Sequence, residues 1–308
     1  MRKNSFKVFL VLSFILMVSA CPHKTEPEPT PPITTVTKTP TASEADANGF
    51  VTISAGSMPL GSDGSYHVTL TKAYMICDHE VTQKEWQDVM GSNPSGFRSN
   101  PATGEVQENR PVEQVSWYAT IAYCNKRSLS EGLTPCYSVK VGGVEVDWKN
   151  LEYAAIPTDN NADWNAVVCD FSKKGYRLPT EAEWEIAARG GLTGDVYAGT
   201  DDVNKLGDYA WYDENFGGGH HEVKKKLPNG YGLYDMSGNV WEWCWDWYGD
   251  YTTSEATDPT GPDDVSTRVG RGGSFRTSQK SCKAFHRSTK STLDGNYQIG
   301  FRLVRTVQ

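Results

Sequence analysis

Three stretches between residues 82 and 191 repeat apolar side chains with the period of an α-helix. The first begins at Thr82-Gln83-Lys84-Glu85, which has the form of a capping box, and the third begins at a second capping box, Thr180 to Glu183. Ser116 is the expected cap of the middle stretch. Behind these starts the apolar residues recur three and four positions apart: Trp86, Val89, Met90; Tyr118, Ile121, Ala122; Trp184, Ala187, Ala188. We therefore expect three short helices, ended by glycines near residues 91, 132 and 190.

The strand signals are shorter and weaker than the helix signals. Residues 51–53 alternate in polarity, and residues 67–70, 74–76, 139–141, 144–146 and 300–304 also read as strand pieces. After residue 191, short aromatic pieces are separated by Gly, Asn and Asp. The chain has 29 Gly, 10 Trp and 15 Tyr, a composition that indicates a loop-rich α+β domain fixed by large buried rings.

The N-terminus has the layout of an export signal. Three basic residues precede an apolar run, Val8 to Val18, and small residues then lead to Cys21. This arrangement resembles a bacterial lipobox, so we expect residues 1–20 to be a signal peptide and Cys21 to be lipidated. The alternatives are an ordinary cleaved signal with an incidental cysteine and, less favoured, a transmembrane helix, for which the run is short. The prediction is an exported, membrane-anchored lipoprotein at the cell surface or outer membrane.

A Pro/Thr-rich segment, residues 21–48, follows the signal and nearly lacks large apolar side chains. Such a segment cannot bury enough surface to fold, so we expect a disordered tether before a single domain at residues 49–308. Residues 1–20 carry three basic and no acidic residues, so their removal takes the net charge from −8 to −11. Nucleic acid is therefore not an expected partner.

Six cysteines follow Cys21, and none of their spacings forms a zinc-binding CxxC pattern. They are Cys77, Cys124, Cys136, Cys169, Cys244 and Cys282. Export permits disulfides, but six cysteines allow fifteen pairings. The sequence does not choose among these, and several of the thiols are expected to be free and buried.

Three long motifs carry a family resemblance. They are Arg177-Leu178-Pro179-Thr180-Glu181-Ala182-Glu183-Trp184-Glu185, then the segment from Asn229 to Trp243, and then Arg271-Gly272-Gly273-Ser274-Phe275 closed by Gly300-Phe301-Arg302. In this order they resemble the formylglycine-generating enzyme (sulfatase-modifying factor) family over residues 50–306. The resemblance implies a C-type-lectin-like α+β fold with low regular secondary structure.

The resemblance also implies a structural calcium ion. Its ligands on the matching positions are the Asp235 and Glu242 side chains and the Gly238 and Val240 carbonyls, all of them the hard oxygens that Ca²⁺ prefers. The alternative is that Asp235 and Glu242 cap a tight turn without a metal.

The family's oxidation of a substrate cysteine needs two cysteines that bind Cu(I) as thiolates. Cys282 matches the second of these and Ser274 matches an active-site serine, but Thr277 stands at the position of the first cysteine. A neutral hydroxyl cannot replace a soft thiolate toward Cu(I). We therefore do not expect copper or catalysis, and interpret Cys282 as a buried or disulfide-bonded residue. The alternative is an exported oxidase that acts on a protein cysteine through Cys282 and Ser274.

Residues 275–297 mix Arg, Lys, Ser, Thr, Phe, His and Tyr with little apolar periodicity. Such a stretch is a poor core and a good contact surface, and it resembles the changeable surface of the variable proteins of diversity-generating retroelements. We expect a surface that binds a protein or glycan outside the cell. The predicted contact residues are Phe275, Arg276, Lys280, Phe285, His286, Tyr297 and Trp211. A structural envelope protein without a ligand is the remaining alternative.

Overall fold

The computed structural model describes residues 38–194, 196–251, 254–263 and 266–307, which belong to one compact unit, Val36–Gln308. The predicted signal peptide, Cys21 and most of the predicted tether lie outside the described residues. Residues 38–48 do not behave as a tether. Ala42 bridges Ile53, and the Ser43 amide donates to the Thr52 carbonyl at 2.9 Å. The predicted domain start at residue 49 is therefore too late, because these backbone groups pair with the first strand.

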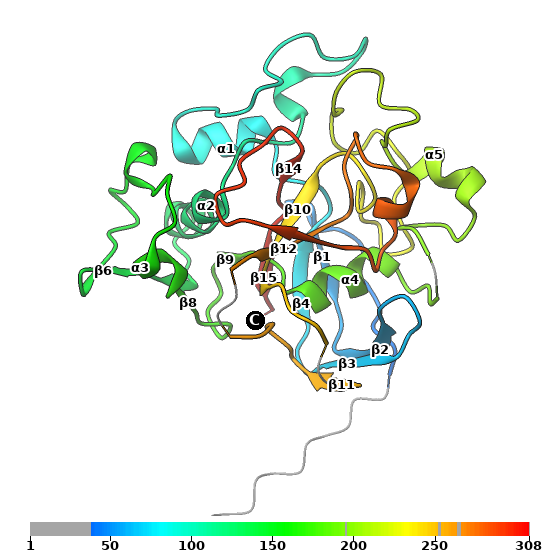
Figure 1. Ribbon diagram of the computed structural model, residues 1–308, viewed down its shortest axis with the longest axis horizontal. Helices are drawn as coiled ribbons and strands as arrows, with labels where there is room; N and C mark the ends of the chain where they lie inside the picture. The colour runs from blue at the N-terminus through cyan, green and yellow to red at the C-terminus, as the bar shows by residue number, and fades with distance from the viewer. Residues whose placement is uncertain (1–37, 195, 252–253, 264–265, 308) are drawn as a thin grey trace, which may run out of the picture. The chain divides into compact units, whose positions relative to one another are not determined.

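The first sheet joins the two ends of the described chain. Its order is β1 (Phe50–Ile53), β4 (Tyr74–Cys77), β15 (Val304–Thr306) and β9 (Tyr176–Arg177), and every pairing is antiparallel. Figure 1 shows β1, β4 and β15 side by side in the middle of the molecule. The closing strand predicted for residues 300–304 is split: Val304 begins β15, whereas Gly300 belongs to a strand of the second sheet.

A second sheet is built from strands between residues 241 and 300. Its order is β13 (Arg287–Lys290), β12 (Arg268–Arg271), β10 (Trp241–Trp247) and β14 (Ile299–Gly300), with β10 and β14 parallel. A third sheet has the order β11 (Glu255–Thr257), β3 (Tyr66–Leu70) and β2 (Gly56–Leu60). Two-residue strands form two further pairs: β5 (Tyr137–Ser138) with β8 (Val168–Cys169), and β6 (Lys140–Val141) with β7 (Val144–Glu145).

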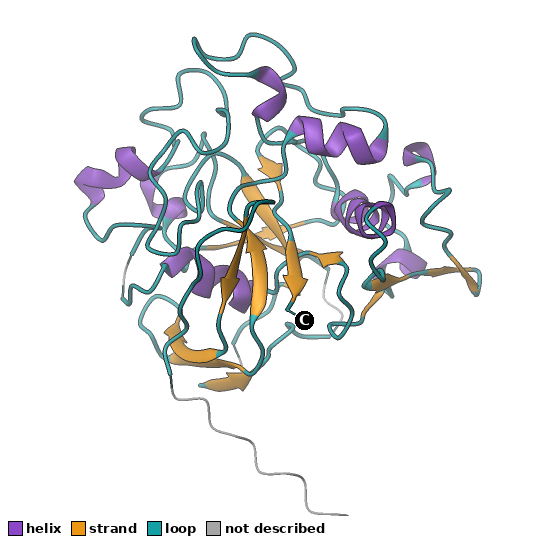
Figure 2. Ribbon diagram, turned by 180° about the vertical axis from the view of Figure 1, so that it is seen from behind, coloured by secondary structure: helices purple, strands orange, loops and turns teal. Residues whose placement is uncertain are grey.

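The three predicted helices are confirmed as α1 (Gln83–Met90), α2 (Trp117–Ser130) and α4 (Glu181–Arg189). Both capping boxes form, and Gly91 and Gly190 end their helices in the left-handed conformation. The shorter elements are α3 (Ala162–Asn165), α5 (Leu206–Tyr209), η1 (Gln107–Asn109), η2 (Tyr153–Ala155), η3 (Val203–Lys205) and η4 (Gln279–Cys282). Figure 2 shows helices around the central strands, with long loops between them.

Large rings and buried ion pairs fill the interior. The Trp86 and Tyr123 rings stack at 5.2 Å between centroids, and Phe301 meets both edge-on. Glu185 accepts from Arg189 at 2.8 Å and also pairs with Arg271, with all three side chains nearly inaccessible to water. Buried charges persist only when they are paired in this way, so these ion pairs fix how α4 packs against the second sheet.

Candidate functional site

The segment between β12 and β14 carries six of the seven predicted contact residues. It leaves the second sheet after Arg271, passes through η4, returns as β13 and rejoins the sheet at Ile299. Because β12 and β14 both pair with β10, backbone hydrogen bonds hold the segment at both ends. Its side chains are therefore displayed from a fixed framework.

A glycine turn brings Thr277 and Cys282 together. Gly273 has a φ of +80°, and a Cβ added to it would lie 3.0 Å from Thr277 Oγ1 and 3.1 Å from Cys282 Sγ. The two side chains thus meet at the place where the resemblance implies a pair of copper-binding thiols. The alignment of Thr277 with the missing cysteine is consistent with this geometry.

The residues at this place do not fit a copper centre. Thr277 Oγ1 accepts from the Ser274 amide at 2.8 Å and donates to the Ser274 carbonyl at 3.0 Å, so the hydroxyl is committed to the turn. Burial raises the pKa of the Cys282 thiol to about 12, partly opposed by a hydrogen bond with Thr277. Ser274 Oγ in turn donates to Gln298 Oε1 at 3.0 Å. No pair of thiolates is available here to bind Cu(I).

The predicted contact residues divide by exposure. Arg276 and Lys280 are exposed, and Trp211, Phe285, His286 and Tyr297 are partly exposed. Arg276 Nη1 donates to the Tyr297 hydroxyl at 2.8 Å, so these two side chains form one polar and aromatic surface element. One predicted contact residue is not exposed: the side chain of Phe275 is completely buried. Its assignment as a contact residue is corrected, because its ring packs inward.

Phe275 belongs to an aromatic floor beneath this surface, made of Phe97, Phe216, His220, Phe275 and Tyr297. Ring centroids of Phe275 lie 5.6 Å from Phe97, 5.6 Å from Phe216 and 5.9 Å from His220. Burial lowers the pKa of His220 to about 4, so its imidazole is neutral at physiological pH. Sequence reasoning missed Phe97 and His220, because each lies in an irregular loop with no periodic signal.

Trp211 reaches the same region from another part of the chain. The Asn239 amide donates to its carbonyl at 2.9 Å, and the Asp213 amide donates to the Thr277 carbonyl at 3.2 Å. Its ring stacks on His221 at 3.7 Å, and Lys226 Nζ lies 3.9 Å from the ring centroid. These contacts place Trp211 at the edge of the surface with its ring held between two neighbours.

Glu242, a predicted calcium ligand, is occupied by other partners. Its carboxylate accepts from Arg302 Nε and Nη2, both at 2.6 Å, and from Trp184 Nε1 at 2.7 Å. The side chains of Glu242 and Arg302 are both inaccessible to water. The charge of Glu242 is therefore neutralised by a guanidinium, and this residue does not fit the predicted ligand set.

Asp235 lies close to the same cluster but is less fully satisfied. Its Oδ2 accepts from the Lys224 amide at 2.8 Å, while its buried Oδ1 has no partner among the described residues. Glu80, which sequence reasoning missed, accepts from Asn239 Nδ2 at 2.6 Å and from the Val240 amide at 3.1 Å. Burial raises the pKa of Glu80 well above its usual value and that of Asp235 to about 6. Calcium stays a prediction here, with only Asp235 offering an unused side-chain oxygen.

The six cysteines from Cys77 to Cys282 are all free in the part of the chain that the structure describes. Five of the six are buried, so their packing role agrees with the expectation for free cysteines. The same described residues contain no helix with the length and hydrophobicity needed to cross a membrane.

Comparisons with known proteins show which family this chain resembles. Residues 35–307 match the sulfatase-modifying factor enzyme 1-like domain. The chain is 38% identical over 225 residues to chaperone protein LppX of Paenibacillus barcinonensis, covering 68% of this chain and 71% of that protein. It is 38% identical over 158 residues to the formylglycine-generating enzyme of Streptomyces coelicolor, covering 46% of this chain and 50% of the enzyme.

The solved structure of Treponema denticola variable protein 1 is also similar. It superimposes with a TM-score of 0.81 and 47% identity, covering 88% of this chain and all of that one. This confirms the resemblance to variable proteins and the expected C-type-lectin-like α+β fold with low regular secondary structure. On the match over residues 35–307, the chain belongs to the sulfatase-modifying factor enzyme 1-like family.

Proposed function

We propose that this chain is an exported, lipid-anchored protein that binds a protein or glycan through its C-terminal face. We define the C-terminal face as Arg276, Lys280, Phe285, His286 and Tyr297, with Trp211 at its edge. One observation carries the proposal: Thr277 lies against Cys282 with its hydroxyl fully hydrogen-bonded. The same turn that lacks a second thiol presents these exposed side chains.

The chemistry of the C-terminal face suits recognition of another macromolecule. Arg and Tyr are enriched among the residues that dominate binding energy at interfaces, and Arg276 and Tyr297 are already hydrogen-bonded to each other. That contact reduces the side-chain freedom lost on binding. Arg276 and Lys280 are cationic on a chain of net charge −8, so we expect the partner to present acidic or hydroxyl-rich groups.

Three further observations support an extracellular binding role. The N-terminal sequence has the export and lipidation layout around Cys21. A chaperone, as LppX is named, acts on other proteins, which favours a protein partner. The likeness to a variable protein favours a C-terminal face whose side chains differ between relatives.

Binding to arrays of surface glycans and extracellular proteins tests the proposal. The full-length chain is compared with Arg276→Ala/Tyr297→Ala and with Lys149→Ala, a control at an exposed lysine outside the C-terminal face. A loss of about 1–3 kcal/mol, or roughly fivefold to 150-fold in affinity, is expected for the double variant only. Unchanged binding by the double variant would refute the assignment of the face, and a chain that binds nothing would favour a structural envelope role.

A near-copy of the 3′ end of the gene with adenine-specific differences, beside a reverse transcriptase gene, would establish diversification.

An exported oxidase remains the second candidate, because the chain is 38% identical to a formylglycine-generating enzyme over 158 residues. It would act on a protein cysteine through Cys282 and Ser274. Incubation with copper, O₂ and a Cys-x-Pro-x-Arg peptide tests it directly. Aldehyde formation that is lost in Cys282→Ser would replace the binding proposal with catalysis.

A further inference from the structure

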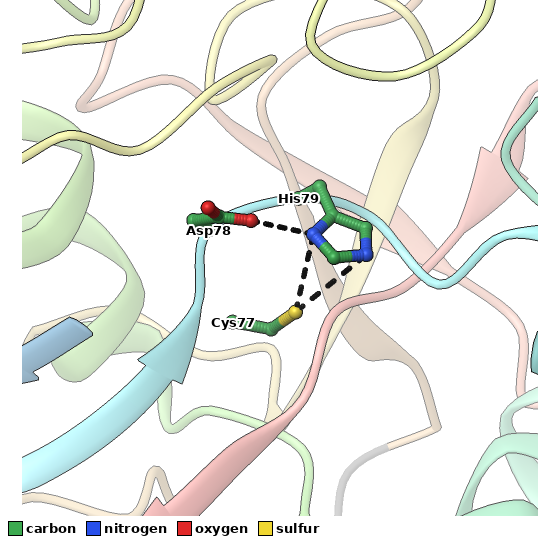
Figure 3. Close-up of side chains that lie close together, drawn as sticks. All are labelled: Cys77, Asp78 and His79. Atoms are coloured by element: carbon green, nitrogen blue, oxygen red, sulfur yellow. Dashed lines mark hydrogen bonds and ion pairs between the residues drawn. The ribbon is translucent and has the colours of Figure 1, made fainter. Parts of the chain in front are cut away.

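Three consecutive residues at the end of β4 bring three different metal-binding atoms close together. Figure 3 shows the contacts of Asp78 Oδ1 and Cys77 Sγ meeting at the same nitrogen of the His79 ring, Nδ1. His79 Nδ1 lies 3.5 Å from Cys77 Sγ and 2.5 Å from Asp78 Oδ1. The three donor atoms all lie within 4.8 Å of one another, and no other part of the described chain brings together such a group of His, Cys and acidic ligands.

One of the separations, between sulfur and nitrogen, matches that around a tetrahedral ion. Zn–S and Zn–N bonds of about 2.3 and 2.05 Å place sulfur and nitrogen roughly 3.6 Å apart, close to the 3.5 Å between Cys77 Sγ and His79 Nδ1. Oxygen and nitrogen ligands would be about 3.3 Å apart, so the Asp78 carboxylate must withdraw by roughly 0.8 Å. That movement exchanges one hydrogen bond for a metal–oxygen bond. Cys77 Sγ also lies 4.0 Å from His79 Nε2, so the sulfur lies over the ring and must turn toward the imidazole plane to meet the same ion.

The other ring nitrogen of His79 already has the partner that a metal-bound histidine requires. His79 Nε2 lies 3.5 Å from Glu85 Oε2. Glu85 is itself fixed, because its Oε2 accepts from the Thr82 amide at 2.9 Å and its Oε1 accepts from Arg127 at 3.3 Å. Metal-bound histidines almost always donate their second nitrogen to such a carboxylate, which fixes the ring orientation and strengthens the ligand.

Two of the three ligands line hollows that open to solvent, His79 one and Asp78 another. A surface hollow of about 490 Å³ is lined by His79, Glu85, Glu222 and Lys224, among others. Lys224 Nζ pairs with Asp78 at 2.7 Å, but it holds Oδ2 and leaves Oδ1 to face His79. The Lys224 side chain is 41% exposed, so it can follow the carboxylate when this moves. Water from the hollow would supply a fourth ligand.

We propose that Cys77, Asp78 and His79 form a binding site for a divalent transition-metal ion of the zinc class. A thiolate, an imidazole and a carboxylate are the ligand types that Zn²⁺ takes, whereas Ca²⁺ and Mg²⁺ prefer oxygen atoms alone. The site shares no ligand with Cys282 or Asp235. It is therefore separate from the copper position and from the predicted calcium site of the family.

Titration of the full-length, untagged chain with Zn²⁺ and with Co²⁺ tests the proposal. We expect one ion per chain at this site, and with Co²⁺ a thiolate-to-metal charge-transfer band in the near ultraviolet. His79→Asn should lower affinity by about a hundredfold or more, and Glu85→Gln by roughly 10- to 100-fold. Gln also preserves the capping box of α1, so loss of affinity in this variant would not reflect loss of the helix.

Matched controls separate this site from other ligands in the chain. His67→Asn changes an exposed histidine on β3, and Cys244→Ser changes another buried cysteine; neither should alter affinity or the charge-transfer band. Cys77→Ser should remove the band. Circular dichroism establishes that each variant is folded. Absence of saturable binding in the folded parent chain, or binding with equal affinity in His79→Asn and His67→Asn, would overturn the proposal.

Discussion

Replacing Arg302 by Met tests whether this guanidinium holds the buried acidic cluster together. Arg302 is the cation that pairs with Glu242, and Glu80 and Asp235 lie close enough to influence the same charges. Met fills much of the same volume but carries no charge. The substitution leaves three buried carboxyl groups without this counter-charge, so we expect a large loss of folding stability.

The structure sets the size of this loss. Arg302 and Glu242 are both fully buried and share two hydrogen bonds of 2.6 Å. Removing one partner of such a pair costs about 3–5 kcal/mol, because the other charge stays buried and unpaired. Arg302 also donates to the Cys77 and Tyr234 carbonyls at 3.1 and 3.0 Å. These losses overlap, so about 3–5 kcal/mol is the expected total.

Glu242→Gln should cost less than Arg302→Met. Gln keeps one side-chain oxygen, the kind of acceptor to which Trp184 Nε1 and Arg302 Nε donate in the parent chain, and the guanidinium keeps its hydrogen bonds to the Cys77 and Tyr234 carbonyls. We expect a loss of roughly 1–3 kcal/mol, the cost of weakening a buried hydrogen-bonded group. The double variant should lose less than the sum of the two single losses, because neither charge is then left alone.

Urea denaturation followed by circular dichroism gives the free energy of unfolding of each variant. Arg98→Met, which removes an exposed arginine, is the matched control and should change stability by less than about 0.5 kcal/mol. If Arg302→Met loses no more than Arg98→Met, or if the two single losses are additive, the reasoning from an uncompensated buried charge is wrong.

Three further outcomes follow from the structure. The pKa of His220 is lowered from 6.5 to about 4, so between these pH values the folded state binds fewer protons than the unfolded state and its stability falls as the pH drops. His220→Gln should remove about 3 kcal/mol of that fall, measured by urea titrations at several pH values. An unchanged dependence of stability on pH would contradict the assignment. Thr277→Cys should raise Cu(I) affinity by about tenfold or more, measured by competition with a chromophoric chelator, because the new thiol faces Cys282; an equal rise in Thr277→Ser would argue against this geometry. Thr180→Ala should destabilise the domain by about 0.5–2 kcal/mol through loss of the α4 cap, and an unaltered thermal midpoint would show that the cap is dispensable.

The sequence predicted those elements whose determinants are local. Thr82 and Thr180 predict the starts of their helices because a capping box is contained within four residues, and both caps form. The proximity of Thr277 and Cys282 could also be predicted from the sequence, because the family motif sets their spacing after Gly273. In irregular loops the sequence has no periodicity that shows whether a side chain points inward or outward. Phe275 was therefore predicted to lie at the surface although it is buried.

Features built from distant segments could not be predicted from one sequence. Glu80, Arg302 and the Asp235–Glu242 segment come from three parts of the chain, and only the fold shows that Arg302 neutralises Glu242. A calcium prediction drawn from the short motif alone could not include that competitor. His79 likewise gave no signal, because its relation to Glu85 depends on how the chain turns between β4 and α1.

Both ends of the chain stretch that forms the C-terminal face are secured by backbone pairing, at β12 and at β14. Backbone hydrogen bonds do not depend on which side chain a residue carries, and exchanges at exposed positions usually alter stability by less than about 0.5 kcal/mol. Many different sets of exposed side chains are therefore compatible with one backbone. The side chains of the face proposed for binding can therefore change while the tolerance of the fold keeps stability nearly constant.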